Sequence, residues 1–210
     1  MSKMTLWVHV MAVVAVVVGV GGEAAAQSIV GRVGFPVGGG GEVETRAGGS
    51  SADVDVDDGS GMSLEALILK GAGRGARLGA FIQYTDNREF EPEQGGELRT
   101  GSSLALDGVV EFDLAKTSGV SFHAAGLGGL MVYFPDDDLE EMQEQADDEG
   151  VKFGFNLGGG LGLAVPLSGK LALRGDFYAM YEQATLIDGE QLEYALTNTR
   201  YMLAVGFMLR

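Results

Sequence analysis

Hydrophobic and polar residues alternate with a period of two over most of the chain beyond residue 27. The alternation is clearest over residues 151–167, where apolar side chains take the odd positions and glycine or polar residues take most of the even ones. Such alternation puts successive side chains on opposite faces of a β-sheet. No helical stripe of useful length competes with it, so the sequence predicts an all-β domain. The pattern recurs over residues 29–37, 62–68, 78–85, 103–114, 120–134, 171–182 and 200–210, which makes eight strands in all.

Short connections alternate with long ones between these segments. The short connections are residues 71–75, 116–119 and 168–169, whereas residues 38–61, 88–99, 135–150 and 187–194 are longer and rich in Gly, Asp and Glu. Membrane barrels have short turns on one side and long loops on the other. An even strand count with three short turns and four long loops predicts an antiparallel up-and-down β-barrel with both termini on the short-turn side.

The first 26 residues have a different composition and indicate a targeting segment. Lys3 precedes an apolar run over residues 6–20, and Ala24, Ala25 and Ala26 form an A-x-A cleavage pattern. A permanent membrane anchor is the alternative, but a spanning helix needs about 20 apolar residues and gives no reason for small residues at its end. We therefore expect a cleaved signal peptide over residues 1–26 and a barrel domain over residues 27–210.

The two faces of the predicted strands differ in charge. The more apolar face is nearly free of charge in the later strands, and its rings fall near strand ends, as in the aromatic girdles of membrane barrels. We therefore predict a transmembrane barrel, although a soluble ligand-carrying barrel would also show mixed charge on its solvated face. The girdle candidates are Phe134, Phe153, Tyr181, Tyr201 and Phe207.

The less apolar face carries both signs of charge, which we expect to pair across a narrow lumen. Eight strands make a barrel just wide enough for side chains to fill, so an open pore is not expected. Its charged residues are Arg32, Glu65, Arg77, Asp107, Glu111, Asp113, His123, Lys152, Arg174, Asp176, Glu182 and Arg200.

Composition narrows the range of functions. Thirty acidic residues against 14 basic ones give a formal net charge of −16, which argues against a nucleic-acid partner because such a binder needs a basic face. A hydrophobic content of 46% excludes a disordered acidic chain. Without cysteine the chain forms no disulfide and no thiolate metal site.

A signal peptide followed by amphipathic strands resembles the small outer-membrane barrels of the OmpA/OmpX type, over nearly the whole mature chain. The resemblance implies a place in the bacterial outer membrane, contact with lipid and lipopolysaccharide, and insertion by the barrel-assembly machinery. Such proteins usually end on an aromatic residue that this machinery reads. Here Phe207 lies three places from the end, at Arg210, while the alternating last strand is retained.

His123 is the only histidine beyond the predicted cleavage site, and Ser121 lies two positions away on the same face. The two residues fit a Ser-His-acid arrangement of the kind used by outer-membrane lipid-modifying enzymes. A lumen histidine that is hydrogen-bonded to a carboxylate explains the same residues, and we favour it. We predict no catalytic residue.

Two acidic segments invite a metal-site interpretation. Asp53, Asp55, Asp57 and Asp58 resemble a calcium loop, but Leu64 stands at the twelfth position from Asp53, where a bidentate Glu is required. We therefore expect a solvated loop without a dedicated metal site. The acidic loops are instead candidates for sharing divalent cations with lipopolysaccharide phosphates.

Residues 135–150 are strongly acidic, with Leu139, Met142 and Ala146 at helical spacing, so we expect a short helix capped by an aspartate in a solubilising loop. The glycine run at residues 38–41 lacks the Gly-Lys-Ser/Thr ending of a phosphate-binding loop, and we predict no cofactor.

Two classes of function remain. The favoured one is a non-enzymatic protein that contributes to envelope structure or surface interaction through acidic extracellular loops. The alternative is a small-solute channel or, less favoured, an outer-membrane lipid-modifying enzyme. A wide lumen, or a catalytic constellation within hydrogen-bond reach, would distinguish the alternative.

Overall fold

A computed structural model describes residues 27–59, 61–92, 98–189 and 192–210. The predicted signal peptide lies outside these residues. The described part of the chain forms nine strands and one helix. The strands are β1 (Gln27–Ala47), β2 (Ser50–Asp58), β3 (Ser63–Gly73), β4 (Ala76–Pro92), β5 (Leu98–Thr117), β6 (Val120–Phe134), β7 (Lys152–Pro166), β8 (Leu171–Asp188) and β9 (Leu192–Leu209), and the helix is α2 (Asp137–Gln145).

Eight of the described strands close into one antiparallel ring. β1 pairs with β3, each later strand pairs with the next, and β9 returns to pair with β1 from Ile29↔Leu209 to Ala47↔Leu192. β2 forms a hairpin with the outer half of β1 and also pairs with β4 from Val56↔Pro92 to Asp58↔Phe90, so it continues the barrel wall beyond β3 at the loop end. The predicted eight-stranded up-and-down barrel is therefore confirmed.

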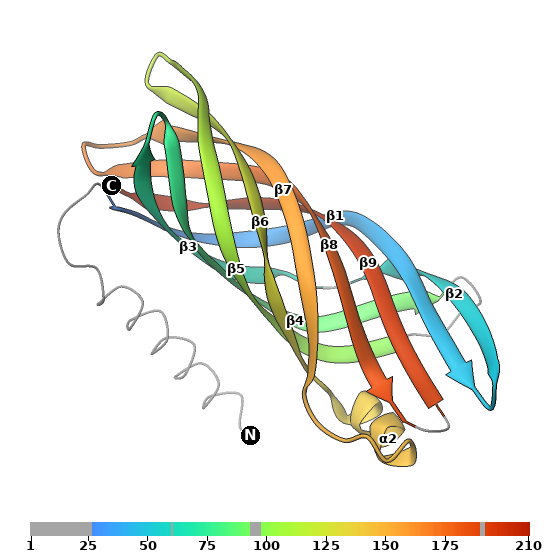
Figure 1. Cartoon of the computed structure of the whole chain (residues 1–210). Coiled ribbons are helices and arrows are strands. Elements are labelled where there is room, and N and C mark those ends of the chain that lie inside the picture. Colours follow the sequence, from blue (N-terminus) through green and yellow to red (C-terminus); the bar gives the residue numbers. More distant parts are fainter. Residues whose placement is uncertain (1–26, 60, 93–97, 190–191) are drawn as a thin grey trace.

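The two ends of the barrel differ, as Figure 1 shows. The described start of β1 and the C-terminus lie together at the end with the short turns, while α2 and the β1–β2 hairpin lie at the opposite end. In two of the turns, Arg74 (φ 53°) and Ser118 (φ 49°) precede a glycine that also has positive φ. Positive φ at both central residues is the requirement of the tightest hairpin turns.

The expected loop over residues 38–61 is wrong in part, because it contains the outer half of β1 and all of β2. Val43, Val54 and Val56 face the protein interior there, while Glu42 and Asp55 alternate with them on the exposed face. The same period of two is present in this part of the sequence. The sequence predicts a loop there because the segment is rich in acidic residues. Strands also extend into the predicted loops at residues 88–99 and 187–194.

The apolar face points outward around the ring. Phe153, Leu157 and Leu161 are 68%, 64% and 61% exposed, while Arg174 and Arg200 are buried inside. A soluble barrel has the opposite arrangement, so the soluble alternative is excluded and the outer surface is the lipid-contacting belt of a transmembrane barrel. The predicted girdle rings Phe153, Tyr181, Tyr201 and Phe207 all lie on this outer face.

No helix among the described residues is long and apolar enough to cross a membrane.

Half of the inward-facing positions of β7 are glycine, which makes room for side chains of the neighbouring strands. A Cβ atom on Gly160 would lie 2.3 Å from the Phe177 carbonyl oxygen and 2.5 Å from the Tyr178 Cβ atom. In contrast, a Cβ atom on the outward-facing Gly126 of β6 would meet nothing within 4 Å. The lumen is therefore close-packed at Gly160, whereas Gly126 lies on the open outer face of the barrel.

We expect Gly160→Ala to lower the free energy of unfolding by about 1–3 kcal/mol, because overpacking forces the backbone or Tyr178 to shift. Gly126→Ala is the matched control and should be neutral or slightly stabilising. Heat-modifiable gel mobility across a urea series measures both, since the single tryptophan, Trp7, lies outside the barrel domain. Equal midpoints for the two variants would contradict close packing on the β7 side.

Candidate functional site

A first group of buried charges fills the lumen on the short-turn side, and we call it the turn-side network. Arg32 of β1 pairs with Glu65 of β3 and, at 2.6 Å, with Asp176 of β8. Arg174 bonds Asp176 at 2.8 Å and Glu111 of β5 at 2.5 Å. All five side chains are at most 7% exposed, so their charges compensate one another rather than being hydrated.

A second group, the loop-side network, lies nearer the long loops. Glu182 of β8 accepts from Arg88 of β4 at 2.7 Å and from Arg200 of β9 at 2.6 Å. Asp58 of β2 lies 3.8 Å and 4.0 Å from the same two guanidinium groups. The Arg88 guanidinium also lies over two aromatic rings, 5.2 Å from the centre of Phe90 and 5.8 Å from that of Tyr133.

Gln83 of β4 joins the two networks. Its amide nitrogen donates to Glu65 at 3.1 Å, and its amide oxygen accepts from Arg200 at 2.9 Å. At the short-turn end, Arg77 extends the chain of contacts, since it pairs with Glu111 at 2.8 Å and with the half-exposed Asp113. Linked polar side chains therefore run along the barrel interior from the turns to the loop-side network.

Little free space remains beside the turn-side network. A void beside Arg32, Arg174 and Tyr178 measures about 20 Å³, which is room for about one water molecule. In this part of the lumen, the expectation that paired charges fill the interior is confirmed.

Asp107 departs from that expectation. Its carboxylate is buried, and its hydrogen-bond partner in the described part of the chain is the Asn156 side-chain amide, at 3.4 Å. The other buried carboxylates each lie within 4.0 Å of an arginine nitrogen. Asp107 is thus the one lumen carboxylate among the described residues that lacks an ion pair.

His123 and Ser121 are not brought together as a catalytic pair. The His123 Nε2 atom lies 2.7 Å from Asp176 Oδ1, inside the turn-side network, and Gly162 of the neighbouring strand leaves room for this contact. The Ser121 hydroxyl is instead within 3.5 Å of the Ala164 carbonyl oxygen and of the Arg210 guanidinium. The geometry is that of a lumen histidine bonded to a carboxylate.

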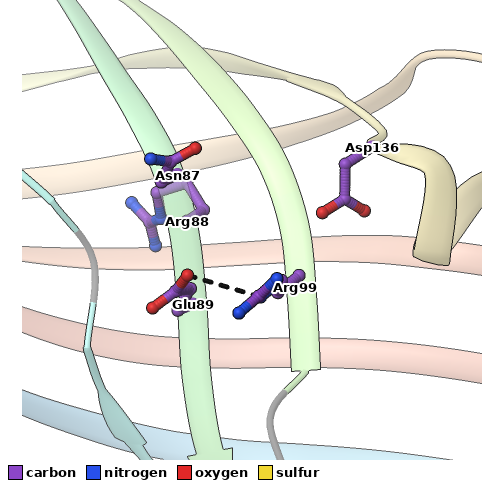
Figure 2. A pocket seen from close by; sticks show the side chains of 5 residues that line it. All are labelled: Asn87, Arg88, Glu89, Arg99 and Asp136. Carbon is purple, nitrogen blue, oxygen red and sulfur yellow. Dashed lines mark ion pairs between the residues drawn. The ribbon is translucent and has the colours of Figure 1, made fainter.

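A polar pocket of about 340 Å³ opens near the loop end, lined by Asn87, Arg88, Glu89, Arg99 and Asp136. Figure 2 shows Glu89 of β4 and Arg99 of β5 facing each other across it, 3.4 Å apart. Small-molecule sites are mostly apolar with a few polar groups, whereas this lining carries mixed charge. Arg88, which lines the pocket, also pairs with Glu182 and so belongs to the loop-side network.

The four aspartates whose spacing resembles a calcium loop lie in strand β2. Asp53, Asp55 and Asp57 point to its exposed face, and Asp53 and Asp55 lie opposite Glu44 and Glu42 of β1. Repulsion from Asp53 and burial raise the pKa of the Glu42 carboxyl above its ordinary value. Among the described residues no group of three or more His, Cys, Asp or Glu is arranged to hold a metal ion.

The expected acidic helix is confirmed as α2. Asp136 is its N-cap, and its carboxylate accepts from the Leu139 amide at 3.1 Å. The helix docks on the barrel through Gln143, whose side chain is buried and donates to the Leu186 carbonyl oxygen at 2.9 Å. The acidic loop is therefore an ordered part of the loop end.

Asp148 fastens the segment that follows α2. Its carboxylate accepts from Lys152 Nζ at 2.6 Å and from the Asp188 amide at 2.5 Å. Partial burial raises the pKa of this carboxyl, but the hydrogen bonds from Lys152 and Asp188 outweigh it, so the pKa lies below the ordinary 3.8. A depressed folded-state pKa stabilises the contact above pH 3.8, and the stabilisation is lost as the pH falls through the lowered value.

We expect Asp148→Asn to speed amide hydrogen exchange at Asp188 severalfold at pH 7, because a charge-assisted acceptor is lost. Asp147→Asn, at the exposed neighbouring position, is the control and should leave Asp188 unchanged. Mass spectrometry of exchanged peptides resolves the two variants. If both give wild-type exchange, Asp148 does not fasten the loop.

Sequence reasoning missed Arg88 and Asp58 as lumen residues, because both fell in segments expected to be loops. The alternation of Arg88 with Glu89 and Phe90 was the available signal, since Arg88 and Phe90 are both fully buried. The position of Asp58 depends on the hairpin fold of β1 and β2 and has no such signal.

No family model matches this sequence, and no curated protein is significantly similar to it. Solved structures are similar in fold. The outer membrane protein OprG from Pseudomonas aeruginosa is 13% identical with a TM-score of 0.54, over 90% of this chain and 97% of that one. Neisserial surface protein A is 10% identical with a TM-score of 0.49, over 90% and 99% of the two chains.

The outer membrane protease OmpT from Escherichia coli is 8% identical with a TM-score of 0.43, over 89% of this chain and 97% of that one. The similarity to OprG shows that the chain has the fold of a small bacterial outer-membrane β-barrel, as its resemblance to the OmpA/OmpX type implies.

Proposed function

We propose that the protein is a closed, non-enzymatic outer-membrane barrel that presents an acidic surface at its loop end, in envelope structure or in contact with a partner. The observation that carries the proposal is the filled lumen. Two joined networks of buried ion pairs occupy the interior, with a void of only about 20 Å³ beside Arg32 and Arg174.

The loop end is the surface available for interaction. Glu42, Glu44, Asp53 and Asp55 share one outward face of the β1–β2 hairpin, and α2 begins with Asp137 and Asp138. In outer-membrane barrels the longer loops are extracellular. Lipopolysaccharide phosphates would then lie beside these carboxylates, and shared divalent cations would offset the repulsion, since Ca²⁺ and Mg²⁺ take oxygen ligands. Insertion by the barrel-assembly machinery is part of the same proposal.

We expect the purified protein to show no stable conductance steps in planar bilayers, because two networks of buried ion pairs occupy the lumen. A porin reconstituted in the same bilayers is the positive control. Large stable pores would replace this proposal with the channel alternative.

Deleting residues 137–149 tests the role of the loop end. Folding, read as heat-modifiable gel mobility, should persist, while the dependence of lipopolysaccharide binding on Mg²⁺ should change. The variant Glu140→Gln/Glu141→Gln/Glu144→Gln keeps the helix and removes three charges, so it separates charge from shape. Lipid hydrolysis that His123→Ala abolishes would instead identify an enzyme.

A further inference from the structure

The exposed charges of the barrel are divided between its ends. The short-turn end carries five exposed basic residues that make no ion pair with a carboxylate side chain of the described part of the chain. The acidic residue at this end, Asp113, is paired with Arg77. We call the five residues the basic rim, and they are Lys70, Arg74, Lys116, Lys170 and Arg210.

The basic rim borders the apolar belt directly. Lys116 and Arg210 lie two positions and one position beyond Leu114 and Leu209, which are 60% and 55% exposed on the outer face. Both basic residues stand at the inner side of the barrel rim, since Lys116 pairs with Ser121 past a β-bulge and the Arg210 guanidinium lies 3.5 Å from the Ser121 hydroxyl. Lys70 lies two positions beyond Ile68 on the lipid-facing side of β3. At about 3.4 Å per strand residue, these charges lie within roughly 7 Å of the belt. That is the depth of lipid headgroups, which long basic side chains reach by extending from the apolar boundary.

We propose that the basic rim binds the anionic headgroups of phospholipids, with phosphatidylglycerol as the representative, in the leaflet at the short-turn end. The proposal rests on the proposed placement in the outer membrane, where short turns face the periplasm and this leaflet is the inner one. Peptidoglycan is the other anionic material on that side. The rim favours lipid, because its turns are tight and three of its five charges, those of Lys70, Lys116 and Arg210, lie within two positions of an outward-facing apolar residue of the belt.

The expected preference follows from the number of charges. A basic residue near an anionic lipid surface contributes an attraction equivalent to roughly fivefold in association. The five residues are spread around the ring, so each lipid meets one or two of them. We therefore expect phosphatidylglycerol to associate several times more strongly than zwitterionic phosphatidylcholine, and the preference to fall with salt as the charges are screened.

The test uses the protein purified from membranes and reconstituted in phosphatidylcholine bilayers that contain trace spin-labelled lipid. Electron paramagnetic resonance measures the motionally restricted fraction for labelled phosphatidylglycerol and labelled phosphatidylcholine. In the variant K70Q/R74Q/K116Q/K170Q/R210Q the two fractions should become equal. The charge-conserving variant K70R/K116R/K170R should keep the preference, as should R46Q/R99Q, which removes exposed cations from the loop end. Heat-modifiable mobility checks that every variant is folded.

Equal restriction of the two lipids by the wild-type protein would overturn the proposal. So would a preference that survives in the neutralised rim variant, or loss of binding to purified peptidoglycan in that variant without any lipid preference in the wild type. Failure here would leave the closed-barrel proposal intact, since that proposal is judged by conductance. Pore formation, conversely, would leave the lipid measurement unaffected.

Discussion

Glu182→Gln is expected to lower the free energy of unfolding by about 3–5 kcal/mol, the cost of removing one partner from a buried ion pair. Glu182 is fully buried and holds Arg88 and Arg200 at 2.7 Å and 2.6 Å. Without its charge, the two guanidinium groups have Asp58 as their nearest carboxylate, at 3.8 Å and 4.0 Å. The urea midpoint of heat-modifiable mobility in lipid vesicles measures the loss.

Glu193→Gln supplies the matched control. Glu193 makes an exposed ion pair with Arg46 at 3.3 Å, and exposed pairs contribute about 0–1 kcal/mol. Arg88→Met in the Glu182→Gln background should recover part of the stability, because one uncompensated charge is removed as well. If Glu182→Gln and Glu193→Gln cost the same, the loop-side network does not stabilise the barrel.

The second large loss of stability is expected on the outer face of the barrel. Leu161→Arg should cost about 2–4 kcal/mol, the range for a basic residue on the lipid face near the bilayer midplane. Leu161 is 61% exposed and lies near the middle of β7. Desolvation of the guanidinium by hydrocarbon is the physical reason. The same urea series in lipid vesicles gives the value.

Leu167→Arg is the control for depth, because Leu167 is equally apolar and 55% exposed but lies beyond the end of β7, at the belt edge. Near the interface the penalty falls to about 0–1 kcal/mol. A silent Leu161→Arg would mean that the exposed apolar face does not contact lipid.

The period-two pattern was enough to predict the eight strands of the ring and, within the predicted segments, which residues share a face. Leu161 and Gly160 are adjacent in sequence, and their assignment to opposite faces needed only the pleat of the strand. The turns were predictable for a similar reason, because glycine marks the positive-φ positions at residues 75 and 119. These features depend on neighbours in the chain.

The partners of the lumen charges depend instead on how the strands are staggered around the ring. Arg32 and Asp176 are 144 residues apart, and Arg88 and Glu182 are 94 apart. Alternation assigns both members of a pair to the interior but gives no information on their height along the barrel axis. The exception at Asp107 and the polar pocket beside Arg99 both arise from that stagger, so neither could be derived from local sequence.

The lumen networks also bear on when the barrel becomes stable during folding. Arg32 joins β1 to β8, and Gln83 of β4 contacts Arg200 of β9, so these contacts require strands from both ends of the chain. They can form only as the ring closes, after most of the sheet has assembled. Interactions absent from the folding transition state act mainly on the unfolding rate. The ion pairs therefore form late in folding. They lower the unfolding rate of the assembled barrel more than they raise its folding rate.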